Sequence, residues 1–125
     1  MSARSIAAMC MLASAILLMA ASSDGSWLMR VPEKERLRPN PMTADVEAPL
    51  AGAKLFQQHC AACHGANGEG KGKHPDLHSD VVRDARPGEL EWLLENGSIR
   101  RGMPSWSRLP EEQRWQLVTY LKTLK

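Results

Sequence analysis

The pentapeptide Cys60-Ala61-Ala62-Cys63-His64 decides how this sequence is interpreted. C-x-x-C-H is the pattern at which a c-type haem is attached, because two thiols at this spacing can form thioethers with the two vinyl groups of one haem. The next residue, His64, is then placed beneath the ring to ligate the iron. Ala61 and Ala62 are small and let the backbone lie close to the haem edge. The pentapeptide therefore predicts one covalent haem held by Cys60 and Cys63.

A second iron ligand is expected, because the haem of an electron carrier is usually six-coordinate. The candidate is Met103, in Gly102-Met103-Pro104, where Gly102 allows close approach to the ring and Pro104 fixes the exit of the loop. Five of the 7 Met residues precede Glu33, and Met42 precedes the first predicted helix. Met103 is thus the one Met within the predicted domain, and a thioether ligand would raise the reduction potential.

The apolar pattern predicts helices on both sides of these segments and no strand. We expect a first helix from Pro49 to Cys60, a second over 87–95 and a third over 110–124. Proline is favoured in the first turn of a helix, which supports the proposed starts. The sequence therefore predicts an all-α fold, and a domain of residues 48–125 would need a buried group such as a macrocycle to complete its small core.

The first 47 residues are expected to lie outside this domain. Arg4 and the uncharged stretch of about 16 residues that follows are typical of a secretory signal peptide, and the stretch is shorter than the roughly 20 residues of a spanning helix. We expect cleavage after Ser23, with an uncleaved membrane anchor as the alternative. Residues 24–47 are rich in proline and charge and are predicted to form a linker. Export of a haem protein points to a bacterial periplasm.

Length and charge limit the remaining possibilities. A chain of 125 residues is long enough for one domain. Its formal net charge of +2 is too small to argue for a nucleic-acid partner.

Three other interpretations of the cysteine pair are open. A thioredoxin-like redox pair would need a strand before Cys60, and none is predicted. A zinc-binding module without haem would use Cys60, Cys63, His74 and His78, but its middle spacing is shorter than the usual ~12–15 residues and Pro75 interrupts the required helix. If Met103 does not ligate and nothing replaces it, the iron is five-coordinate, as in a haem sensor or peroxidase-like protein. His74 and His78 are alternative candidates for the second ligand.

From Pro49 to Lys125 the sequence resembles class I (monohaem) c-type cytochromes. The resemblance implies that Cys60 and Cys63 form the thioethers, that His64 is the proximal ligand and that Met103 is the distal one. It also implies that the first helix crosses the last helix. Gly52 and Phe56 of the first helix match the positions at which the two helices cross in that family.

Two further residues acquire roles through the same resemblance. Pro75 matches the proline whose carbonyl accepts a hydrogen bond from the Nδ1–H of the proximal histidine, which fixes the imidazole tautomer. Leu77 matches the leucine that packs on the haem. Trp92 and Trp106 are candidates for haem contact, and each is equally compatible with simple packing.

The implied function is one-electron transfer by an electron carrier, not an enzyme in itself, which could be a subunit of an oxidoreductase complex. The expected partners are redox proteins, one donating and one accepting the electron. Basic residues in the loops around the haem edge would favour an acidic docking surface on the partner; they are Lys71, Lys73, Arg100 and Arg101. Membrane contact is expected only if the N-terminal segment is not cleaved.

Overall fold

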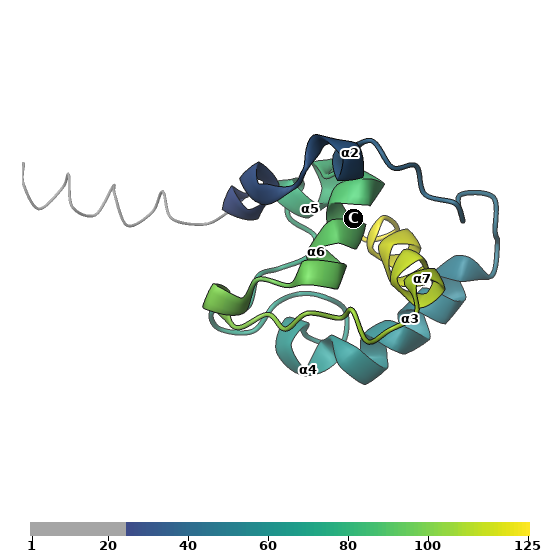
Figure 1. Ribbon diagram of the computed structural model, residues 1–125. Helices are drawn as coiled ribbons and strands as arrows, with labels where there is room; N and C mark the ends of the chain where they lie inside the picture. Colours follow the sequence, from purple (N-terminus) through teal and green to yellow (C-terminus); the bar gives the residue numbers. More distant parts are fainter. Residues whose placement is uncertain (1–24) are drawn as a thin grey trace, which may run out of the picture.

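The computed structural model describes residues 25–125 (Figure 1). The expected signal peptide, residues 1–23, lies outside the described residues. Over 25–125, no helix is long and apolar enough to cross a membrane. The elements in chain order are η1 (Ser26–Arg30), α2 (Glu33–Arg36), α3 (Ala48–His59), α4 (Ala61–His64), α5 (Asp80–Asp84), α6 (Pro87–Asn96), η2 (Ile99–Arg101) and α7 (Glu111–Leu121). The predicted all-α fold is confirmed, since this part of the chain has β pairing only as two isolated bridges.

Helices α3 and α7 cross at close range (Figure 1). The crossing centres on Gly52, where a Cβ atom would lie 2.0 Å from the main-chain oxygen of Gln116 in α7. One helical turn later, the rings of Phe56 and Tyr120 meet with centroids 5.2 Å apart. Gly52 and Phe56 therefore occupy the crossing that the sequence resemblance implied.

Helix α6 packs against α7 and completes the core together with α3 and α7. Its leucines Leu90 and Leu94 are buried together with Leu117 and Val118 of α7. The helix begins at Pro87 as predicted and ends at Asn96, because Gly97 has a φ of +70° and turns the chain away. The last helix is shorter than predicted and ends at Leu121, followed by a turn in which Leu124 still packs on the core.

The stretch that we expected to be a linker carries η1 and α2 and lies against α6 (Figure 1). Pro32 precedes α2 as its N-cap, where a proline costs no hydrogen bond. Val31 is buried, and Trp27 and Leu28 pack on the edge of the core. Tertiary contacts with α6, which sequence periodicity does not report, stabilise this segment.

A buried ion pair joins α6 to α7. Glu91 is fully buried, and one of its carboxylate oxygens accepts a hydrogen bond of 2.7 Å from Nε of Arg114. Its other oxygen lies 3.4 Å from the guanidinium of Arg38, which comes from the segment before α3. Burial raises the pKa of the Glu91 carboxyl, while the two guanidinium groups oppose this effect. Arg114 also donates to the Leu109 carbonyl at 2.7 Å, and among the described residues no buried side-chain nitrogen or oxygen lacks a hydrogen-bond partner.

Candidate haem site

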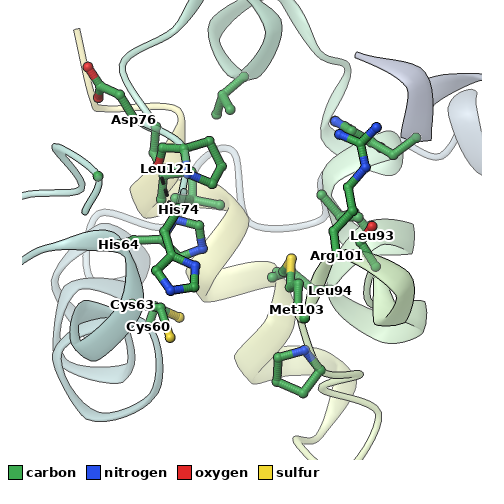
Figure 2. Close-up of a pocket in the computed structure, with 18 of the residues that line it drawn as sticks. Cys60, Cys63, His64, His74, Asp76, Leu93, Leu94, Arg101, Met103 and Leu121 are labelled. Carbon is green, nitrogen blue, oxygen red and sulfur yellow. Dashed lines mark hydrogen bonds between the residues drawn. The ribbon is translucent and has the colours of Figure 1, made fainter. Parts of the chain in front are cut away.

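A single helical turn gathers the residues of the pentapeptide. The α3 helix ends at His59, and the chain re-forms one turn, α4, over Ala61–His64. The backbone N–H groups of Cys63 and His64 both donate to the Cys60 carbonyl, at 3.1 and 2.9 Å. Residues three and four positions apart share one face of a helical turn, so the two sulfurs and the imidazole lie beside one another (Figure 2).

The orientation of His64 is set by Pro75. Nδ1 of the imidazole lies 3.2 Å from the Pro75 carbonyl oxygen, which can only accept, so Nδ1 carries the proton and donates it. Burial lowers the pKa of His64, which favours the neutral form of the ring. The Nε2 lone pair is therefore free to ligate a metal, and the carbonyl strengthens it as a donor.

The two cysteines are free thiols in different surroundings. Cys60 is half-buried at the end of α3, and burial together with the neighbouring Cys63 raises the pKa of its thiol to about 11. Cys63 is exposed. The two sulfurs do not form a disulfide, so each is available for a thioether bond to one vinyl group of a haem.

Met103 lies at the end of a closed loop between α6 and α7. Ser98 and Met103 exchange two backbone hydrogen bonds, 3.0 Å from the Ser98 N–H and 3.1 Å from the Met103 N–H. Gly102 has a φ of +85° in the left-handed region and permits the turn between them. After the loop, the Trp106 N–H donates to the Leu94 carbonyl at 2.7 Å and ties the chain back to α6. Met103 is therefore held by a short main-chain frame.

One cavity joins the pentapeptide to the Met103 loop. Its volume is about 1350 Å³, which exceeds the ~300–1,000 Å³ of ordinary small-molecule sites. Figure 2 shows Cys60, Cys63 and His64 on one side of it and Met103 with Leu94 on the other. All six residues proposed from the sequence to contact the cofactor line this cavity: Cys60, Cys63, His64, Pro75, Leu77 and Met103.

The other histidines occupy different positions. His74 lines the cavity on the same side as His64, with 6.4 Å between the two ring centroids (Figure 2). It therefore does not face His64 across the cavity as Met103 does. His78 does not line the cavity, and its Nδ1 lies 2.7 Å from Asp76 Oδ1. Between residues 25 and 125, no group of three or more His, Cys, Asp or Glu side chains is arranged to hold a metal ion, so the predicted zinc alternative has no preformed site there.

The two tryptophan candidates differ in their position relative to the cavity. Trp106 is buried and lines the cavity, whereas Trp92 does not line it and has the guanidinium of Arg30 above its ring at 5.9 Å. Two further aromatic residues line the cavity. The position of His59 next to Cys60 predicts that it points away from the attachment face, but this prediction is wrong: His59 lines the cavity, and its ring centroid lies 5.1 Å from that of Trp106. Trp27 reaches the cavity from the expected linker and has no sequence signal, because its position depends on tertiary contacts.

Comparisons with known proteins identify the class of the site. Residues 47–121 match the model of a family described as cytochrome c oxidase, cbb3-type, subunit III. The chain belongs to this family of c-type cytochromes. Its sequence is 32% identical over 80 residues to cytochrome c550 of Pseudomonas aeruginosa, a match that covers 58% of this cytochrome and 53% of the relative.

Other relatives of this cytochrome are much longer proteins. It is 29% identical over 100 residues to cytochrome c oxidase subunit 2 of Alkalihalophilus pseudofirmus, covering 67% of this chain and 29% of that protein. It is 36% identical over 86 residues to the quinohemoprotein alcohol dehydrogenase ADH IIB of Pseudomonas putida, covering 65% of this chain and 12% of that protein. The cytochrome thus spans between 12% and 53% of the length of these three relatives.

The fold agrees with a solved cytochrome. Cytochrome CL of the marine methylotroph Methylophaga aminisulfidivorans superimposes with a TM-score of 0.59 at 26% identity, over 68% of this chain and 58% of that one. Family membership means that the chain binds a covalent c-type haem and takes part in electron transfer. The structure fits that group, since Cys60, Cys63 and the His64 imidazole lie together at one side of a large, mostly apolar cavity, and the two cysteines do not form a disulfide.

Proposed function

We propose that this cytochrome is an exported one-electron carrier, or a tethered redox subunit, with His64 and Met103 as the two axial iron ligands. The observation that carries the proposal is their placement on opposite sides of one cavity, with Cys60 and Cys63 beside His64 (Figure 2). A plate-like group attached through the two thiols would lie between the imidazole and the thioether. When bound, the haem supplies a one-electron Fe(III)/Fe(II) couple.

The protein's own residues prepare both ligands. The Pro75 carbonyl keeps the His64 proton on Nδ1 and leaves Nε2 free. The Ser98–Met103 backbone pair fixes the loop, so a thioether ligand would need little rearrangement. Buried apolar side chains of α6 and α7 line part of the cavity; they include Leu90, Leu94, Leu117 and Leu121. A thioether ligand and an apolar lining both favour the reduced state and raise the reduction potential.

Carbon monoxide binding to the reduced holoprotein tests Met103. In Met103→Ala the sixth position is open, so carbon monoxide should bind readily and the weak Met–Fe(III) charge-transfer band should disappear. Met29→Ala is the matched control, because this substitution also removes a thioether, but from a side chain that is 85% exposed and lies outside the cavity. If the wild-type protein binds carbon monoxide as fast as Met103→Ala, Met103 is not a ligand and the sensor or peroxidase-like interpretation is favoured.

The proposal of export to a bacterial periplasm rests on the signal-like N-terminal sequence. The intact mass of the holoprotein, produced in a host that attaches c-type haem, tests whether the signal peptide is removed. Cleavage after Ser23 predicts a chain that begins at Asp24, with Cys10 absent. A mass that includes residues 1–23 would support the membrane-anchored form instead.

The proposed partners are redox proteins with an acidic docking surface. Lys71, Lys73, Arg100 and Arg101 all border the cavity and are exposed. We call these four residues the basic rim. A positive rim around the edge of the cavity would steer acidic partners toward the haem.

A further inference from the structure

Residues 25–38 have a structural relation to the cavity that family membership does not explain. They precede the matched region, which begins at residue 47. Yet Trp27 lines the same cavity as His64 and Met103. We call residues 25–38 the strap.

The strap is docked on the start of α6 by a close main-chain approach. A Cβ atom on Gly88 would lie 2.0 Å from the Glu35 carbonyl oxygen, so α2 can reach this position only because residue 88 is glycine. The contact involves backbone on one side, so a larger residue would have to push the strap away. Gly88 therefore ties the position of the strap to α6.

Arg36 fastens the strap at the same place. Its guanidinium lies 3.2 Å from Oε1 of Glu89, whose side chain is 9% exposed. The same guanidinium donates to the main-chain oxygens of Val31, at 3.2 Å, and of Leu28. One side chain thus holds the turn between η1 and α2 and joins it to α6.

The strap also contacts the loop that carries Met103. The Arg101 guanidinium donates to Ser26 Oγ at 2.9 Å, and the Arg30 guanidinium lies 3.4 Å from Ser98 Oγ. Ser98 is the residue that exchanges two backbone hydrogen bonds with Met103. A displacement of the strap would therefore reach the Met103 frame through a direct contact.

We propose that the strap is a positioning element that closes one side of the haem cavity with Trp27 and holds the Met103 loop in place across the cavity from His64. The inference deepens the proposed function and rests on Met103 as an axial ligand. Replacement of Met103 by an external ligand requires the loop to open, and the docked strap opposes this movement. The strap thus protects the six-coordinate state that suits electron transfer.

Imidazole binding to the oxidised holoprotein measures this opening, because an imidazole nitrogen replaces the thioether sulfur without any change of oxidation state. In Arg36→Ala and in Gly88→Ala we expect imidazole to bind about tenfold faster, which corresponds to about 1.4 kcal/mol of easier opening. Neither substituted residue touches the cavity. Lys34→Ala is the control, since it removes an equal charge from α2 at an exposed position.

Chymotrypsin cleavage after Trp27 reports the release of the strap in the same variants. In Arg36→Ala and Gly88→Ala we expect both earlier cleavage and faster imidazole binding. Lys34→Ala should resemble the wild type in both measurements. Early cleavage with an unchanged imidazole rate would overturn the positioning role. Unchanged cleavage in both variants would overturn the docking itself. The Met–Fe(III) band of the wild-type protein separates the two proposals, because its absence contradicts Met103 ligation whatever the strap variants do.

Discussion

The orientation of one imidazole by one main-chain carbonyl is the most specific contact of the site. The Pro75 oxygen fixes the tautomer of His64, and burial lowers the pKa of the ring and favours its neutral form. A proline carbonyl is well suited to this task, because proline restricts the backbone that presents it. The Ser98 frame performs the corresponding task for Met103.

Glu111, at the start of α7, gives a pH-dependent prediction at the same scale. Hydrogen bonds from Arg38 and then Trp115 hold the pKa of its carboxyl below the usual range. A carboxyl with a lowered folded-state pKa stabilises the protein above its ordinary pKa of ~4.5, and this contribution is lost as pH falls through the lowered value. Glu111→Gln should therefore reduce the free energy of unfolding of the holoprotein at pH 7 and have little effect near pH 2.

Chemical denaturation at both pH values measures this difference. Glu112→Gln is the matched control, because Glu112 lies in the same first turn and has the same favourable interaction with the helix dipole. An equal effect of the two substitutions at pH 7, or an effect of Glu111→Gln that persists at low pH, would contradict the role of the Arg38 contact.

Several site residues could be proposed from the sequence because their chemistry is local. Cys60, Cys63 and His64 form a motif of five residues, and Met103 was distinguished by its position between helices. Trp27 could not be found in this way, since an aromatic ring in a charged segment has no pattern that places it beside a cavity. Trp92 is the opposite case. It was a candidate for haem contact from the sequence, but in the structure its ring lies under the guanidinium of Arg30.

At the scale of elements, the crossing of α3 and α7 is the contact on which the fold depends most directly. Gly52→Ala would place a methyl group 2.0 Å from the Gln116 carbonyl and force the helices apart. We expect a loss of about 3 kcal/mol in the free energy of unfolding, at the upper end of ordinary overpacking. Denaturation of the holoprotein measures it, with Lys54→Ala on the exposed side of α3 as the control. A loss below that of Lys54→Ala would show that the crossing tolerates a wider separation.

The elements that periodicity predicts are the ones that bury a continuous apolar face. Helices α3, α6 and α7 were expected to within a few residues for that reason. The short elements η1, α2, α4 and α5 were not expected, because four or five residues carry no measurable period. For α2 the stabilising contacts come from Gly88 and Glu89, about fifty residues away along the chain, which a local reading of proline and charge cannot detect.

At the scale of the whole molecule, the placement of charge matters more than the net value of +2. Lys73→Glu with Arg100→Glu should slow oxidation of the reduced holoprotein by the anion hexacyanoferrate(III) at low salt, and should weaken or reverse the dependence of that rate on ionic strength. Arg101 is left intact because it donates to Ser26. Lys34→Glu with Lys125→Glu changes the net charge equally at positions outside the cavity lining. Equal oxidation rates in the two double variants would contradict the steering role of the basic rim.

The most direct test of the account is the visible and near-infrared spectrum of the wild-type holoprotein, recorded in both oxidation states and as the pyridine haemochrome. Covalent attachment through Cys60 and Cys63 with His64 and Met103 ligation predicts a c-type haemochrome, low-spin spectra in both states and the Met–Fe(III) charge-transfer band in the oxidised protein. A c-type haemochrome without that band, together with a high-spin reduced spectrum, would contradict the central claim that Met103 faces His64 across the iron.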